Sequence, residues 1–221
     1  ASATPNRFFC DPKVPADFLP ANAIAPWWKP GADSRISLPV IEVLDGQLIT
    51  LRSDIVCTEQ ELQDGRAAEN DLLKIAVVNR YQHAPVAIAW IKNVGLREGA
   101  LASSVAHDSH NIVAVGTDDA SICRAVNLVI AEQGGISACS GLQPDGLRRE
   151  MVLPLPVAGL MCGSDGYDVA TAYTRIDAFS KELGATLGSP FMSLSFMALL
   201  VIPELKLSDK GLFDGKTFRF L

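Results

Sequence analysis

Residues 105–116 read Val105-Ala106-His107-Asp108-Ser109-His110-Asn111-Ile112-Val113-Ala114-Val115-Gly116, and this stretch decides the fold that we predict. It joins a polar cluster, which holds two of the three histidines, to an apolar run at residues 112–115. The run is apolar and ends at a glycine, so we predict a buried strand there. A polar cluster at the mouth of a buried strand is where proteins of mixed α and β structure often place chemistry.

A helix is predicted directly after this strand. Thr117 or Asp118 can cap its first turn, and acidic side chains favour its positive end. Apolar residues recur at i, i+3, i+4, i+7 and i+8 and form one stripe, namely Ile122, Ala125, Val126, Val129 and Ile130. Gly134-Gly135 ends the pattern. The stripe predicts an amphipathic helix that covers the sheet.

Two more helices are predicted towards the end of the chain. Residues 165–183 form a second amphipathic pattern that stops at Gly184. Ser189-Pro190 is typical of a helix start, and residues 191–200 are apolar on nearly every side, which predicts a buried helix. Residues 203–211 are predicted to form a loop. We interpret the block from Phe191 to Phe196 as core.

The remaining segments are predicted to be strands. Residues 40–44 and 47–51 flank Asp45-Gly46, a pair typical of a type I′ β-hairpin turn. Further strands are expected at residues 72–78, 86–91, 136–139 and 149–153. Strands that follow one another directly, with helices inserted late, favour α+β over a regular alternation. The predicted fold is therefore α+β, with mixed or antiparallel sheet layers, two amphipathic helices and one buried C-terminal helix.

The first residues differ in composition from the rest. Seven of the 13 prolines lie within the first 39 residues, which disfavours a long helix or a central strand. Several aromatic residues argue against a free linker, among them Trp27 and Trp28. We therefore predict a proline-rich extended arm over residues 1–37, packed on a neighbouring surface, followed by one domain over residues 38–221. A peptide-binding role for the arm is the alternative.

Composition and charge exclude several classes of protein. The net charge of −6 argues against nucleic acid as a partner, and no apolar run reaches the ~18 residues of a membrane span. Five scattered cysteines without a Cys-x-x-Cys pair predict free thiols and a cytoplasmic location. The sequence begins Ala1-Ser2-Ala3 without an initiator methionine, so a processed or cut piece of a longer chain is one expectation.

The histidine cluster allows three interpretations from its residues alone. His107 and His110 face the same way only in a turn or helix. With Asp108 and another acid, such as Asp118, Asp119 or Glu204, they could bind a divalent metal. A neutral imidazole could instead act as a general base. The third possibility is that these side chains only hold a sharp turn. The spacing leaves all three open.

Several blocks of the sequence resemble the C-terminal domain of bacterial adenine deaminase, of the amidohydrolase superfamily. They keep the order and spacing of that family from about residue 38 to the end. The blocks are Val105 to Ile112, Val115-Gly116-Thr117-Asp118-Asp119, Leu153 to Met161, Pro190-Phe191-Met192-Ser193-Leu194-Ser195-Phe196 and Pro203 to Leu212.

The resemblance implies hydrolysis of adenine to hypoxanthine and ammonia. In that family a binuclear manganese or iron centre in a barrel domain activates the water. This chain lacks the barrel and its His-x-His pair, so we expect no metal ligands here and an inactive isolated chain. The implied partners are adenine, the amidohydrolase barrel and further copies of the chain.

On this resemblance, one set of side chains is expected to act at the mouth of the active site: His107, Asp108, His110 and Asn111. A second set is expected to bind or support the substrate: Ser109, Asp118 and Asp119. Two alternatives remain. The chain could be a non-catalytic interaction module, or a stand-alone metal-binding hydrolase that uses His107 and His110.

Overall fold

The computed structural model describes residues 8–23, 25, 35–58, 61–62 and 70–221. A 3-10 helix, three α-helices and eleven strands are placed in these ranges. In chain order they are η1 (Pro15–Phe18), β1 (Ile36–Val43), β2 (Thr50–Cys57), β3 (Leu73–Val78), β4 (Ala87–Lys92), β5 (Ala100–Ser103), β6 (Ile112–Gly116), α3 (Asp119–Ala131), β7 (Gly135–Cys139), β8 (Glu150–Pro154), α4 (Gly166–Glu182), α5 (Pro190–Ser195), β9 (Leu205–Ser208), β10 (Gly211–Asp214) and β11 (Arg219–Phe220).

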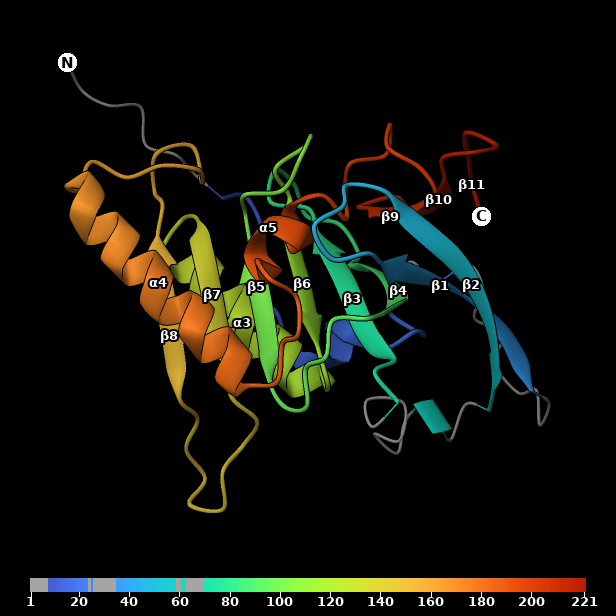
Figure 1. Cartoon of the computed structure of the whole chain (residues 1–221), viewed down its shortest axis with the longest axis horizontal. Coiled ribbons are helices and arrows are strands. Elements are labelled where there is room, and N and C mark those ends of the chain that lie inside the picture. Colours follow the sequence, from blue (N-terminus) through green and yellow to red (C-terminus); the bar gives the residue numbers. More distant parts are fainter. Residues whose placement is uncertain (1–7, 24, 26–34, 59–60, 63–69) are drawn as a thin grey trace.

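An eight-stranded sheet organises the chain, in the order β2-β1-β4-β3-β6-β5-β7-β8 (Figure 1). Only β1 and β4 run parallel, whereas all other neighbours are antiparallel. A small second sheet holds β9, β10 and β11. The sheet is therefore mixed, and the α+β prediction is confirmed.

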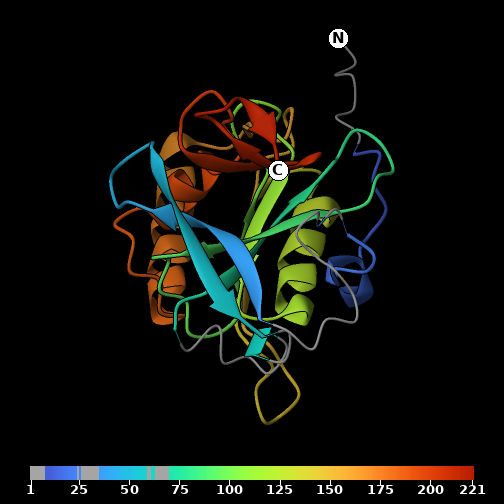
Figure 2. The same cartoon turned by 90° about the vertical axis from the view of Figure 1, so that its right-hand side faces the viewer.

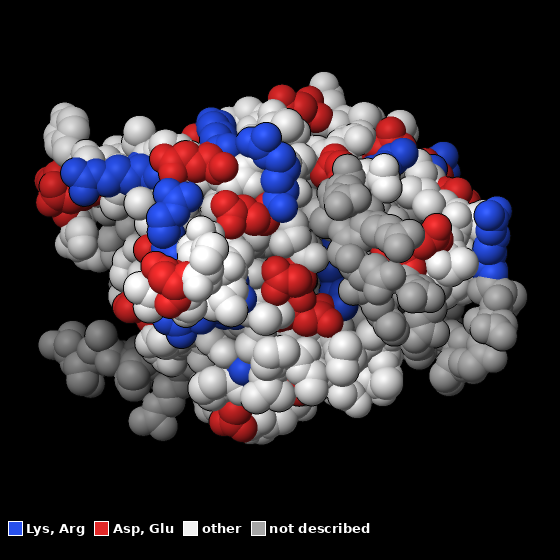
Figure 3. Space-filling model, turned by 90° about the horizontal axis from the view of Figure 1, so that it is seen from below, with Lys and Arg blue, Asp and Glu red and all other residues white. Residues whose placement is uncertain are grey.

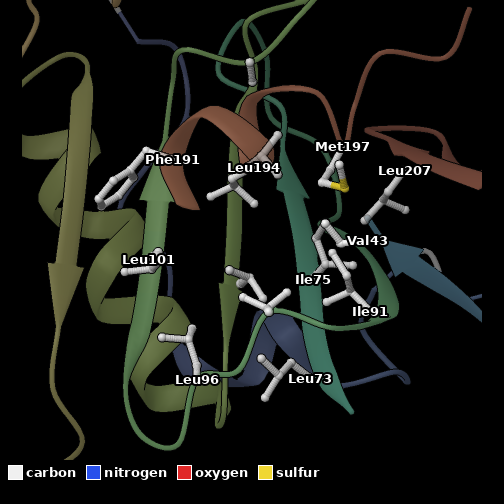
Figure 4. Packing of buried hydrophobic residues seen from close by; sticks show 14 of the residues in the cluster. Val43, Leu73, Ile75, Ile91, Leu96, Leu101, Phe191, Leu194, Met197 and Leu207 are labelled. Atoms are coloured by element: carbon white, nitrogen blue, oxygen red, sulfur yellow. The ribbon is translucent and has the colours of Figure 1, made fainter. Parts of the chain in front are cut away.

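Helices cover both faces of this sheet. Figure 2 shows α3 on one side and α4 on the other. Alternate residues of a strand point to opposite faces, so β3 serves both cores. Ile75 and Val77 join the core beneath α4 and α5, and Ala76 and Val78 join the core beneath α3. In Figure 4, Phe191 and Leu194 of α5 lie over the sheet next to Leu101 of β5.

The predicted amphipathic helices are confirmed. The Asp118 carboxylate accepts a hydrogen bond from the backbone N–H of Ser121 and caps α3. The predicted stripe of α3 is buried against the sheet. In α4, Asp165 caps the start, and Ile176 and Phe179 are buried. Both helices begin where a short acidic side chain satisfies free amides.

The predicted type I′ turn is wrong. β1 ends at Val43 and β2 begins at Thr50, so six residues connect them. Of the pair Asp45-Gly46, only Gly46 has a positive φ, +69°, whereas type I′ needs two. Distant contacts set this loop: the Asp45 carboxylate accepts the N–H of Gly188, and Thr50 bonds to residues 203–205.

The buried helix is shorter than predicted, because α5 ends at Ser195. The carbonyl of Ser195 accepts the N–H of His107 at 2.8 Å, which occupies the acceptor that the next helical turn would need. The predicted loop at 203–211 is also wrong, because Leu205–Ser208 form β9, with Leu205 and Leu207 buried. β5 is an unpredicted strand, made mostly of small residues, between β6 and β7.

The described part of the N-terminal segment packs on α3. Phe18 is fully buried, and the backbone N–H of Lys13 donates to Asn127 Oδ1 at 2.7 Å. The arm's Trp27 and Trp28 lie outside the described residues.

The face seen in Figure 3 mixes basic and acidic side chains and shows no broad patch of one sign. Among the described helices, none is both long and apolar enough to cross a membrane.

Candidate functional site

The two clustered histidines lie in the connection between β5 and β6, at the end of the sheet where β3, β5 and β8 finish. The connection closes as a tight turn because the N–H of His110 donates to the carbonyl of Ala106 at 2.7 Å. His110 has a φ of +53°, a left-handed conformation that histidine adopts more often than most residues. The turn therefore projects its side chains from the edge of the sheet.

This turn brings the two imidazoles together. The ring centroids of His107 and His110 are 5.6 Å apart, and the planes meet at 67°. His107 also stacks on Phe196, just after α5, at 5.1 Å and 27°. Asp108 and Ser109 are exposed at the tip of the turn. The two rings, one carboxylate and one hydroxyl form a compact polar surface.

His110 lies in an environment that disfavours its charged form. Burial lowers its pKa below the usual value, and the neighbouring His107 and Arg80 lower it further, while Asp108 opposes them. Its Nδ1 is buried and has no hydrogen-bond partner among the described residues. This environment favours the neutral imidazole of His110, which can accept one hydrogen bond and donate another.

Arg80 lies beneath the turn and was not predicted from the sequence. It is only 5% exposed, and its guanidinium stacks on the rings of Phe8 and Tyr81 at 4.9 and 4.7 Å. Nη2 donates to Tyr81 Oη and to the carbonyl of Ala158, both at 2.9 Å. Its Nε is buried without a partner, and no described carboxylate forms an ion pair with it. Arg80 thus places a buried positive charge under the histidines.

Arg80 and its neighbours also fix the turn itself. The backbone N–H of Arg80 donates to Oδ1 of the buried Asn111 at 3.2 Å. Tyr81 Oη donates to the carbonyl of Ser109 at 2.7 Å. The register of β3 against β6, with Val78 opposite Ile112, brings these distant residues together. In the sequence, the only sign of this contact is that a polar segment follows directly after the apolar strand β3. The pairing of β3 with β6 is needed to show that this segment lies beside the histidine turn.

A second loop braces the cluster from the side of β8. The hydroxyl of Ser104 donates to the carbonyl of Gly159 at 2.6 Å and accepts the N–H of Gly135 at 2.9 Å. Because Ser104 is fully buried, these bonds replace the water that the groups would otherwise bind. The start of the 105–111 turn is therefore anchored through Ser104 to Gly135 and Gly159.

Asp118 and Asp119 are not part of this cluster. β6 separates them from the histidines, and its five residues span roughly 13 Å. Asp118 caps α3, while Asp119 pairs with Lys74 of β3. Glu204 lies elsewhere as well and pairs with Lys216 at 2.8 Å.

The described residues contain no group of three or more His, Cys, Asp or Glu side chains that could hold a metal ion. Within the described residues, the turn therefore offers hydrogen-bonding groups and not a set of metal ligands. The arrangement can donate and accept hydrogen bonds at a surface and can stack on a flat ring.

Comparison with known proteins shows the family of this chain. Residues 47–219 match the family described as the adenine deaminase C-terminal domain. An adenine deaminase from Sulfurovum sp. (strain NBC37-1) is 46% identical over 99% of this chain, which spans 36% of that relative. One from Salinibacter ruber is 49% identical over 100% of this chain, which spans 38% of it.

A third relative gives the same result. An adenine deaminase from Methanosarcina acetivorans is 47% identical over 82% of this chain and is covered over 32% of its own length. This chain spans about a third of the length of the curated relatives it matches. It belongs to the family of adenine deaminase C-terminal domains.

Proposed function

We propose that this chain acts in an adenine deaminase, where the 105–111 turn forms part of the mouth of the active site. The observation that carries the proposal is the placement of two imidazoles and the Asp108 carboxylate on one surface turn, above a buried arginine. The relatives named adenine deaminase are much longer than this chain, which supports a further domain that completes the site.

The reaction proposed for the whole enzyme is adenine plus water to hypoxanthine plus ammonia. A purine presents ring nitrogens that accept hydrogen bonds and an amino group that donates them. His107 and neutral His110 can both donate and accept, Asp108 can accept, and the Ser109 hydroxyl can do either. Their role is to orient the purine and to close the site over it. Asn111 is a positioning residue, because it is buried and bonds to Arg80.

The metal belongs to another part of the enzyme in this proposal. A binuclear manganese or iron centre would lie in an amidohydrolase barrel, which is also the proposed partner of the turn. The residues of this chain contribute binding, orientation and exclusion of water, and Asp118 and Asp119 contribute stability through α3. The proposed location is the cytoplasm, in keeping with five free cysteines among the described residues.

The test is alanine substitution in the full-length enzyme that carries this domain. His107→Ala and His110→Ala should each lower kcat/KM for adenine by at least about tenfold, with unchanged metal content. The matched control is His83→Ala, because His83 is 72% exposed and its ion pair among the described residues is with Asp11 on the surface. Unchanged kinetics in both variants would refute the role and would favour a non-catalytic assembly module.

A further inference from the structure

Two buried polar atoms at the histidine turn have no hydrogen-bond partner among the described residues. They are Nε of Arg80 and Nδ1 of His110. Buried polar groups in proteins are bonded with few exceptions, and each exception calls for an explanation. The function proposed above uses neither atom, so both are open to another role.

Contacts on either side of His110 bring Arg80 to the turn. The backbone N–H of Arg80 donates to Asn111 Oδ1 at 3.2 Å. The hydroxyl of Tyr81 accepts a bond from Arg80 Nη2 at 2.9 Å and donates to the carbonyl of Ser109 at 2.7 Å. Residues 80 and 81 therefore hold both chain neighbours of His110. The guanidinium is close enough for its charge to lower the pKa of the imidazole.

The guanidinium of Arg80 can only donate. It carries five N–H donors and no acceptor. Nη2 donates to Tyr81 and to the carbonyl of Ala158, and Nε–H remains without an acceptor among the described residues. An imidazole nitrogen beside such a group gains a hydrogen bond only when it has no proton itself.

The acceptors next to His110 in the turn bond to other donors. The carbonyl of Ala106 accepts the backbone N–H of His110 at 2.7 Å, and the carbonyl of Ser109 accepts the Tyr81 hydroxyl. Neither bonds to Nδ1, and Asp108 is exposed at the tip of the turn. A proton on Nδ1 would therefore have no acceptor in the described part of the chain, whereas a lone pair there has a donor close by.

We propose that Arg80 holds neutral His110 in the tautomer with its proton on Nε2, through a hydrogen bond donated to Nδ1 from the side of the guanidinium. The bond that one ring nitrogen makes sets which nitrogen carries the proton. Because the ring is partly exposed while Nδ1 is buried, Nε2 is on the exposed side. His110 thus presents a donor at the surface of the turn. In the deaminase, and resting on the function proposed above, this donor recognises a ring nitrogen of the purine.

The tautomer can be measured by proton–nitrogen correlation NMR in the full 221-residue chain. At about pH 8, well above the ordinary pKa of histidine, wild-type His110 should show the Nε2–H pattern alone. Arg80→Met should move it towards the mixture of tautomers seen in the urea-unfolded chain, while Arg80→Lys, which keeps a donor, should move it less. The control Arg148→Met should change nothing, because Arg148 bonds to Ser121 of α3.

Two results of this experiment would overturn the proposal. One is a proton on Nδ1 of wild-type His110, and the other is an identical tautomer pattern in wild type and Arg80→Met. The wild-type measurement needs no substitution, so it decides the question even if Arg80→Met fails to fold.

Adenine analogues with one ring nitrogen replaced by CH test the recognition step in the full-length enzyme. His110→Ala should lower kcat/KM for adenine at least about tenfold, but should have little effect with the analogue that lacks the recognised nitrogen. An equal loss for adenine and every analogue would overturn the recognition step and keep the proposed function. No loss with any substrate would refute the proposed function, whereas the tautomer found by NMR does not depend on it.

Discussion

Arg80 and Gly159 are in such close contact that a Cβ at position 159 would lie 2.4 Å from Arg80 Nη1. Gly159→Ala must therefore displace the guanidinium, and it also strains a backbone with a φ of +74°. We expect it to lower the free energy of unfolding by about 2 kcal/mol more than Gly146→Ala, measured by urea denaturation. Gly146 has a similar φ, +79°, but no atom within 4 Å of such a Cβ. Equal losses in the two variants would mean that the contact is unimportant.

The charge of Arg80 should be measurable at His110. Arg80→Met removes a positive charge that disfavours the imidazolium, so the pKa of His110 should rise towards its ordinary value. Arg80→Lys keeps the charge and should preserve most of the depression. Proton NMR titration of the histidine rings in this chain gives both values, with exposed His83 as the internal reference. An unchanged pKa in Arg80→Met would show that the charge of Arg80 does not contribute to the depression.

The same depression makes a prediction about acid stability. The folded pKa of His110 lies below its unfolded value, so this contribution to stability is present above about pH 6.5 and is lost as the pH falls. Replacing His110 with Asn should therefore make unfolding less sensitive to pH in that window. Thermal unfolding between pH 5 and pH 7.5 tests this, with His83→Asn as the control. A wild-type slope retained in His110→Asn would contradict the assignment.

Lys206 predicts a pH dependence in the alkaline range. It is fully buried on β9, its Nζ donates to the carbonyl of Leu48 at 2.8 Å, and burial lowers its pKa from 10.5 to about 8. Between these values the unfolded chain holds more protons, so this residue makes stability rise with pH. Across that window the gain is roughly 3 kcal/mol. Lys206→Met should lack this rise in stability with pH. We therefore measure the unfolding free energies of variant and wild type from pH 7.5 to 10.5, and we expect their difference to change by roughly 3 kcal/mol. Parallel curves would contradict the burial of a charged amine.

Asp118 separates a structural from a substrate-binding role. Asp118→Ala removes the side-chain cap of α3 and should cost about 1 kcal/mol of stability, whereas Asp118→Asn should keep most of it. Both variants of the full-length enzyme should retain the KM for adenine. A raised KM with normal stability would instead place Asp118 at the substrate.

Local patterns were sufficient to predict much of the fold. The apolar run of β6, the Asp118 cap and the stripe of α3 depend on residues close in sequence. The predictions are wrong where contacts between residues distant in sequence determine the local structure. The 44–49 loop follows from contacts of Thr50 some 155 residues away, and α5 stops where His107 takes a carbonyl.

In the candidate site, too, the features set by nearby residues were predicted, and those set by distant residues were not. The i, i+3 spacing of His107 and His110 predicts rings on one side of a turn, and the structure brings them together. Arg80 lies far upstream and joins them only because β3 pairs with β6. Asp118 follows the same strand closely in sequence, yet it lies at the far end of β6, because a strand carries the chain away from its start.

The bonds between Thr50 and residues 203–205 also bear on how the protein is made. During synthesis, residue 50 leaves the ribosome long before residue 205, so the loop before β2 must wait for its partners. This corner of the sheet can therefore be completed only after residues 203–205 have been synthesised. Truncation from the C-terminal end should loosen the earliest-synthesised strands first, although they lie at the opposite end of the sequence.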